Sequence, residues 1–143
     1  MATWDEFAAG VPVLAAAIRD RFASNLHHVV GTIRPDGSPR LSGSEVTFAG
    51  GEVSIGMMAR SRKLADIERD PRVEIHSAPL EDDLAGGDAK LAGRLRRTGT
   101  VGDDEGFMFA LDLERASLVR VDGDELDITV WTPERGARTM RRK

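Results

Sequence analysis

The sequence predicts a mainly β domain of the α+β class, in which short antiparallel strands form a barrel or a sandwich. Two observations predict this class. Apolar residues alternate with polar ones in short runs, and Gly, Pro and Asp separate these runs at hairpin spacing. Helical spacing of apolar residues occurs only near the N-terminus and in one short internal segment. The length of 143 residues fits one domain, so we assign residues 1–143 to a single unit.

Residues 1–24 form the predicted helical segment at the N-terminus. Thr3 suits an N-cap, and Glu6 stands three residues later, which is the spacing of a capping box. Apolar residues then recur at helical spacing at Leu14, Ile18 and Phe22. We expect helix from about Thr3 to Phe22, with a break near Gly10.

A three-stranded meander is predicted next. Residues 28–34 have a strand composition, and residues 35–38 read Pro-Asp-Gly-Ser, a turn in which proline presets φ and glycine accepts a positive φ. Residues 40–48 form the expected return strand. After a second turn, apolar residues at alternate positions predict a half-buried third strand at residues 53–58.

A short helix is predicted after the third strand, from Ser61 to Asp70. Leu64 and Ile67 stand three residues apart, and Pro71 ends the helix. Further strands are expected at residues 73–76, 90–101, 107–113, 118–121 and 126–130, and residues 134–143 form a basic C-terminal tail. We expect these eight runs to form six or seven strands, and closure of the sheet would remove its exposed edges.

Composition excludes several classes of protein. The chain has no cysteine, which excludes disulfides, thiolate metal sites and a cysteine nucleophile. No apolar run approaches the roughly 18 residues that span a bilayer, and the acidic N-terminus does not resemble a signal peptide. A net charge of −4 gives no overall attraction for nucleic acid. We therefore expect a cytoplasmic protein that binds neither membranes nor nucleic acids.

The segment most indicative of chemistry is Ser61-Arg62-Lys63, at the expected start of the inserted helix. A helix start offers unpaired N–H groups and a partial positive charge. Two cations there oppose the helix dipole unless an anion binds, so the pattern indicates an anion site, most simply for phosphate. The alternative is that both side chains merely face water. Gly56, just before the helix, would let a flat ring approach the strand backbone.

Several motifs together resemble a known family. Residues 35–40 read Pro-Asp-Gly-Ser-Pro-Arg, Ser61-Arg62-Lys63 starts the helix, residues 70–73 read Asp-Pro-Arg-Val, and Trp131-Thr132-Pro133 lies near the C-terminus. This set, spread over residues 26–138, resembles the FMN-binding split β-barrels related to pyridoxamine 5′-phosphate oxidase. That superfamily also contains deazaflavin-dependent reductases and haem-binding members.

The resemblance implies a six-stranded antiparallel split β-barrel that forms a homodimer, with the cofactor in the groove between the subunits. The implied cofactor is FMN or the 8-hydroxy-5-deazaflavin coenzyme, with haem less expected. Arg62 and Lys63 would hold the cofactor phosphate, Ser61 would cap the helix, and Gly56 and Met57 would lie near the ring. The second strand would flank the ring with four residues: Arg40, Leu41, Ser42 and Gly43.

The sequence also departs from the family pattern. Ser44-Glu45-Val46 stands where the oxidase has a basic residue, and Gly56-Met57 replaces an aromatic and hydroxyl pair. The oxidase motif for substrate phosphate, an arginine with a histidine two residues later, has no counterpart, because no histidine follows His76. We therefore expect a flavin- or deazaflavin-dependent oxidoreductase that acts on a small organic substrate, and not a pyridoxamine 5′-phosphate oxidase. No catalytic side chain is assigned.

Two other functional classes stay open: a non-catalytic flavin- or haem-binding carrier or sensor dimer, and a structural dimer whose pocket is vacant. Adjacent His27 and His28 point to opposite faces of a strand, so they cannot share a metal ion. His76 could lie near a groove as a haem ligand or proton donor. Trp4 and Trp131 either stack on a ring or pack in the core. Acidic residues 81–83 lack the glycine-centred loop of a calcium site, and we predict no metal site.

Overall fold

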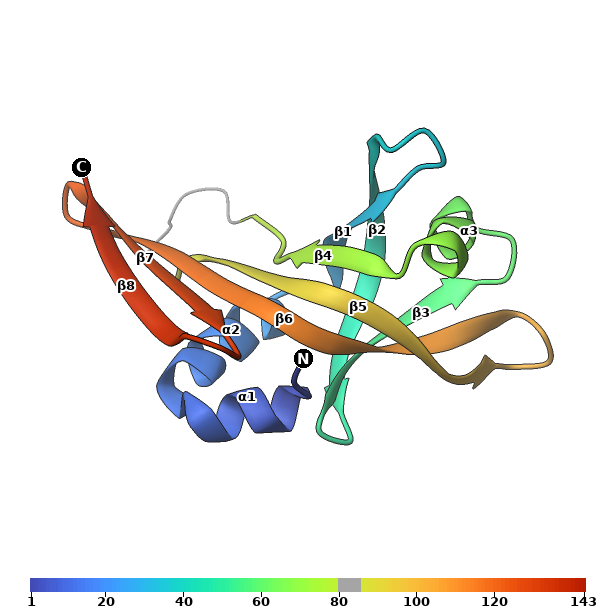
Figure 1. The fold of residues 1–143 in the computed structure, drawn as a ribbon, viewed down its shortest axis with the longest axis horizontal. Helices are drawn as coiled ribbons and strands as arrows, with labels where there is room; N and C mark the ends of the chain where they lie inside the picture. Colours follow the sequence, from blue (N-terminus) through green and yellow to red (C-terminus); the bar gives the residue numbers. More distant parts are fainter. Residues whose placement is uncertain (80–85) are drawn as a thin grey trace.

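The structure is a computed structural model that describes residues 1–79 and 86–143 (Figure 1). Its helices are α1 (Trp4–Gly10), α2 (Pro12–Ala23) and α3 (Arg62–Arg69). Its strands are β1 (His27–Ile33), β2 (Pro39–Ala49), β3 (Glu52–Met58), β4 (Arg72–His76), β5 (Asp88–Val101), β6 (Gly106–Asp122), β7 (Glu125–Thr132) and β8 (Gly136–Arg142). The mainly β class is confirmed.

Six of these strands close into an antiparallel barrel. The hydrogen-bonded order is β3-β2-β1-β4-β5-β6-β7-β8, and an additional pairing of β3 with β6 completes the closure. The strands β7 and β8 continue the sheet beyond β6 as a two-stranded arm, which projects from the barrel away from α3 (Figure 1). The predicted six-stranded barrel, with one short helix inserted after the third strand, is therefore confirmed.

The N-terminal helices pack where the barrel meets the arm. Thr3 caps α1 and exchanges hydrogen bonds with Glu6, so the predicted capping box is present. The helix ends at Gly10, and α2 restarts at Pro12, which suits the first turn because proline needs no backbone N–H partner there. Trp4 packs on Phe7, and Phe7 on Trp131 of β7, with ring centroids 5.1 and 4.7 Å apart. Core packing is thus the observed role of both tryptophans.

The core fills the barrel because alternate residues of each strand point inward. Val30, Ile55, Ile75, Leu91 and Leu111 come from five different strands, and each is at most 1% exposed. Most neighbours of these residues along the strands face outward, and the outer surface of the barrel carries polar residues and glycines beside apolar ones such as Val29 and Ala92. Among the described residues, no helix combines the length and apolar character that a bilayer span needs.

Two segments differ from the sequence prediction. The runs predicted at residues 107–113 and 118–121 belong to one strand, β6, of 17 residues. A register shift between Ala92 and Gly93 of β5 lets the pairing continue past the polar interruption. A Cβ at Gly93 would lie 2.0 Å from the Asp112 carbonyl oxygen, so only glycine allows this approach. The second segment is residues 134–143, predicted as a basic tail. Most of it, Gly136–Arg142, forms strand β8.

Candidate functional site

The start of α3 has the local structure that the sequence predicts. Ser61 is in the extended conformation, and its hydroxyl oxygen accepts a hydrogen bond of 3.3 Å from the backbone N–H of Leu64. The first turn of α3 contains no acidic residue. The partial positive charge of the helix start therefore has no carboxylate within its own turn.

Lys63 turns from this helix start toward β2. Its Nζ donates hydrogen bonds of 3.0 Å to the carbonyl oxygen of Gly43 and 3.1 Å to the hydroxyl oxygen of Ser44. Burial lowers the pKa of the Lys63 ammonium. In the described parts of the chain, no carboxylate lies within ion-pair distance of this nitrogen. A partly desolvated cation thus has only neutral acceptors.

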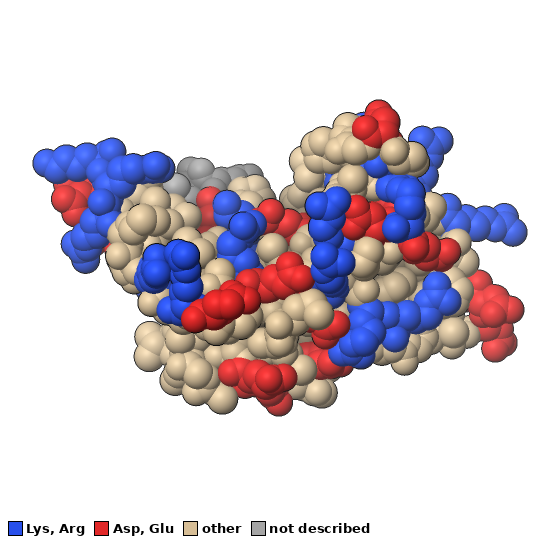
Figure 2. Space-filling view, viewed as in Figure 1, with Lys and Arg blue, Asp and Glu red and all other residues tan. Residues whose placement is uncertain are grey.

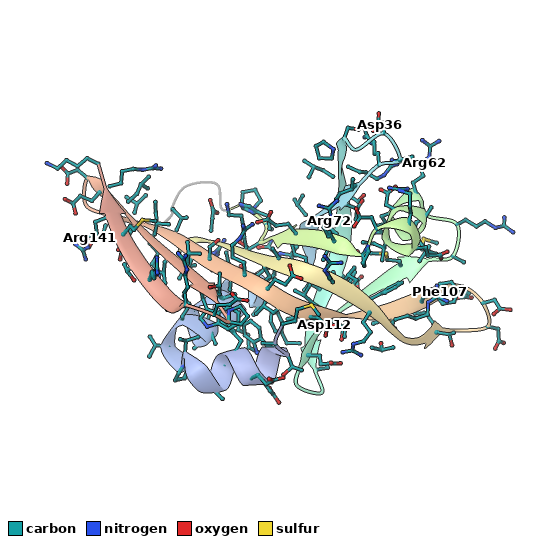
Figure 3. All side chains as sticks on the ribbon, viewed as in Figure 1. Asp36, Arg62, Arg72, Phe107, Asp112 and Arg141 are labelled. Atoms are coloured by element: carbon teal, nitrogen blue, oxygen red, sulfur yellow. The ribbon has the colours of Figure 1, made fainter. Side chains whose placement is uncertain are left out.

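Arg62 places a second cation beside Lys63. Its side chain is exposed, and it lies where α3 approaches the β1–β2 hairpin (Figure 3). It has no ion-pair partner in residues 1–79 or 86–143. Ser61, Arg62 and Lys63 thus stand at the start of α3 as predicted, and their joint binding of an anion stays a prediction.

Arg40 has a different environment, because its charge is neutralised inside the protein. Its Nε donates a hydrogen bond of 2.7 Å to Asp66 Oδ2, which also accepts one of 2.7 Å from the Thr32 hydroxyl. Arg69 lies 3.7 Å from the other carboxylate oxygen. Burial by itself raises the pKa of Asp66, but the hydrogen bonds from Arg40 and Thr32 and the nearby arginine charges outweigh it, so the net shift is downward. This Asp66 cluster joins α3 to β1 and β2.

The remaining predicted residues divide between the core and the surface. Met57 is 2% exposed and points into the barrel, so its side chain is part of the core. Gly56 faces outward, but the Met108 sulfur lies 3.2 Å from the position that a Gly56 Cβ would occupy, so Met108 covers this glycine. On β2, Leu41 and Gly43 are exposed and Ser42 is half-buried. The ring contacts predicted at Gly56 and Met57 remain predictions.

A groove of about 770 Å³ lies on the outer face of the sheet. It lies between the β1–β2 hairpin and the β7–β8 arm, where the space-filling surface is hollowed (Figures 1 and 2). Its volume is in the range of cofactor and ligand sites. Its lining includes small residues, Gly31, Ala92 and Gly93, and larger apolar ones, Val29, Ile33, Pro39 and Leu41.

Strand β2 connects the groove to the helix start. Leu41 lines the groove, and two residues later the Gly43 backbone carbonyl accepts a hydrogen bond from Lys63, whose other partner, Ser44, has its side chain on the opposite, buried face of β2. Two residues span about 7 Å along a strand. The groove and the Lys63 ammonium therefore lie beside the same stretch of β2.

Charged and polar side chains also line the groove. Arg72 pairs with Asp70 at 2.7 Å, and Arg115 pairs with Glu74 at 3.2 Å. His76, at the end of β4, belongs to the same lining. The sequence predicted that His76 could lie near a groove, and the structure has it in the groove lining. The other groove residues come from six strands, and no local motif marks them.

The chain resembles solved structures rather than sequence families. No family model and no curated protein matches it. An FMN-binding protein related to pyridoxamine 5′-phosphate oxidase, from Nostoc punctiforme, superposes with a TM-score of 0.68 at 12% identity, covering 100% of this chain and 98% of that chain. The chain has the fold of the pyridoxamine 5′-phosphate oxidase-related split barrels.

Two further split barrels are similar at low identity. HutZ, the haem storage protein from Vibrio cholerae, has a TM-score of 0.58 at 12% identity, with 71% of this chain and 90% of that chain covered. An F420 reductase has a TM-score of 0.51 at 14% identity, with coverages of 62% and 86%. At these identities the likeness establishes the fold that the three proteins share with this chain.

The other histidines have structural surroundings. His28 is buried, and its Nε2 lies 2.9 Å from the carbonyl oxygens of Phe22 and Asn25, while its Nδ1 accepts a hydrogen bond from the Ala78 N–H. Burial is the main reason that the pKa of His28 is lowered. His27 is exposed and lies 3.7 Å from Glu45. The prediction for the acidic residues 81–83 lies outside the described residues.

Proposed function

We propose that this chain is a flavin- or deazaflavin-dependent oxidoreductase that acts on a small organic substrate. Lys63 is the observation that carries the proposal, because its ammonium is partly desolvated at a helix start without acidic residues and contacts only neutral oxygens. An anion bound there would satisfy this charge, the exposed Arg62 and the helix dipole together. FMN and the 8-hydroxy-5-deazaflavin coenzyme both offer such an anion in a phosphate group.

The groove beside Leu41 is the proposed location of the cofactor ring. Its small and apolar lining residues would contact a flat ring system, and the ring itself would supply the hydride chemistry. The protein would then bind the tail, orient the ring and limit its exposure to water. The FMN-binding protein and the F420 reductase that share this fold support such a cofactor.

A second copy of the chain is the proposed cover of this groove. The groove centre is apolar, and the paired charges Arg72–Asp70 and Arg115–Glu74 lie beside it. A two-fold related copy would offer the same alternation of cations and carboxylates, so the two faces would be complementary to each other. The cofactor would then lie between two subunits of a homodimer.

The test is a cofactor titration with the double variant Arg62→Ala, Lys63→Ala. The absorbance spectrum of the purified protein first shows whether flavin is bound, and FMN and the deazaflavin coenzyme are then titrated into protein freed of ligand. We expect the double variant to bind weaker by a few kcal/mol, the scale of two charge-assisted hydrogen bonds.

The matched control is Arg138→Ala with Arg142→Ala, which removes the same charge from exposed positions on β8. Cofactor affinity should be unchanged in this control. Equal affinity in the wild type and the Arg62/Lys63 variant would contradict the proposed site. Binding of cofactor without turnover of any reducible substrate would favour the non-catalytic carrier instead.

A further inference from the structure

Strand β8, at the end of the arm, has one edge without a partner strand. It is the last strand in the hydrogen-bonded order of the sheet, and among the described residues only β7 pairs with it (Figure 1). This pairing runs from Gly136 to Arg142 without a register shift, and the strand contains no proline. An edge of this kind presents a row of backbone N–H and C=O groups with which a further strand can pair.

On one face of β8 the protein supplies the counter-charge. Arg141, which is labelled on the arm in Figure 3, lies directly opposite Asp127 of β7. Three carboxylates lie within 3.7 Å of its guanidinium: those of Asp122, Glu125 and Asp127. The charge of Arg141 is therefore neutralised within the arm.

On the other face of β8, two cations lack a counter-charge. Side chains two residues apart share a strand face, so Arg138, Met140 and Arg142 lie in one row. The residues of β7 opposite this row are all apolar: Val130, Ile128 and Leu126. In residues 1–79 and 86–143, no carboxylate lies within ion-pair distance of Arg138 or Arg142. Met140, between them, is 58% exposed. Because β7 offers only apolar side chains here, the outer edge of β8 is the side from which a counter-charge can come.

We propose that the edge of β8 binds an extended acidic segment of another protein as an additional strand. In this mode of recognition, backbone hydrogen bonds along the edge supply affinity and alternate side chains supply specificity. The row of Arg138, Met140 and Arg142 specifies an acidic, an apolar and an acidic residue at alternate positions of the segment. This order is the same in both directions, so it holds for a parallel and for an antiparallel segment.

A second copy of β8 does not suit this edge. Pairing two β8 strands would bring Arg138 and Arg142 of one copy close to the same arginines of the other, and like charges on facing strands are destabilising. Charges on an edge strand oppose pairing with a like strand, and here they also favour an acidic one. The edge therefore selects a different partner from the copy that we propose as the cover of the groove.

The test is a titration of the full chain into a fluorescent peptide with the core Glu-Thr-Val-Thr-Glu, followed by anisotropy. A second peptide, with the core Glu-Glu-Thr-Val-Thr, keeps the charge and loses the alternation. We expect saturable binding of the first peptide, with an affinity at least about tenfold higher than that of the second. Binding of the first peptide should weaken about tenfold or more in Arg138→Ala, Arg142→Ala. The matched control Arg34→Ala, Arg60→Ala, which removes two exposed arginines outside the arm, should bind like the wild type. Thermal unfolding of each variant verifies its fold.

Backbone pairing is tested with two N-methylated forms of the first peptide, each methylated on one set of alternate residues. Successive N–H groups of a strand point to opposite edges, so only one of the two forms should lose binding. Four outcomes overturn the proposal: no saturable binding by the wild type, equal affinity for the second peptide, unchanged affinity in the Arg138/Arg142 variant, or wild-type affinity for both methylated forms. Cofactor affinity should be unchanged in the Arg138/Arg142 variant, so failure of this proposal leaves the proposed function intact, and the reverse also holds.

Discussion

Positive side chains have opposite environments at the two ends of α3. At its C-terminal half, Asp66 is 1% exposed and accepts hydrogen bonds from Arg40 and Thr32, so a buried anion neutralises the cation. At its N-terminal end, Lys63 has only neutral acceptors and Arg62 has no described partner. The same kind of side chain is therefore structural where the protein supplies a counter-charge and available for a ligand where it does not.

The largest expected effect comes from removing the counter-charge. Asp66→Ala leaves Arg40 partly buried without its carboxylate, and breaking such a pair costs about 3–5 kcal/mol. Denaturant unfolding measures the free energy directly. Asp66→Asn keeps the size of the side chain, so it should lose less stability than Asp66→Ala. A loss below about 1 kcal/mol in Asp66→Ala would mean that the cluster does not join α3 to the barrel.

A smaller effect is expected at the cap of α3. Ser61→Ala removes the acceptor for the Leu64 N–H and should lower the free energy of unfolding by about 1 kcal/mol. Ser61→Asp restores an acceptor and adds a negative charge to the helix start, so its stability should return toward that of the wild type. In Ser61→Asp the new carboxylate would also compete for the anion site, and FMN affinity should fall. Retained FMN affinity in Ser61→Asp would contradict an anion site at this position.

At Lys63, stability and binding should separate. Lys63→Met loses two hydrogen bonds to neutral oxygens, but it also removes a partly desolvated charge, so unfolding should change by no more than about 1 kcal/mol. FMN affinity should nevertheless fall markedly in the same variant. Calorimetric titration and denaturant unfolding of one preparation measure both quantities. If Lys63→Met lost much stability and kept its FMN affinity, Lys63 would be a structural residue like those of the Asp66 cluster, and the contrast between the two ends of α3 would be wrong.

The smallest expected effect is a difference in acid sensitivity. The folded-state pKa of Asp66 lies below the ordinary value of 3.8, so the unfolded chain binds the proton more tightly. The stability from Asp66 is therefore complete above pH 3.8 and is lost as the pH falls toward the folded-state pKa. Between pH 5 and pH 3, the free energy of unfolding should fall more steeply in the wild type than in Asp66→Asn. Parallel curves would exclude Asp66 as a source of this pH dependence.

Local signals accounted for most of the fold. The capping box of Thr3, the cap of Ser61 and the alternation in each strand are short-range patterns, and the structure contains all three. The basic composition of residues 134–143 favoured a tail, but Gly136–Arg142 pair with β7 as strand β8, and Arg141 lies opposite Asp127 in this pairing. Such pairing is not visible from composition alone.

The site was predictable only where it is local. Ser61, Arg62 and Lys63 form one contiguous motif, and their grouping could be predicted from the sequence. The role of Arg40 could not, because its partner Asp66 lies 26 residues away and reads as one more charge on a polar helix. The groove is built from six strands, so its lining becomes apparent only after the barrel closes.

Anion binding at the start of α3 is tested most directly by comparing ligands with and without the phosphate. FMN and riboflavin share a ring, so their affinity ratio isolates the tail, and the deazaflavin coenzyme can be compared with its phosphate-free analogue in the same way. In the wild type we expect FMN to bind at least about tenfold more tightly than riboflavin, and in Arg62→Ala, Lys63→Ala this preference should disappear. An equal preference for FMN in both proteins would show that the phosphate binds elsewhere.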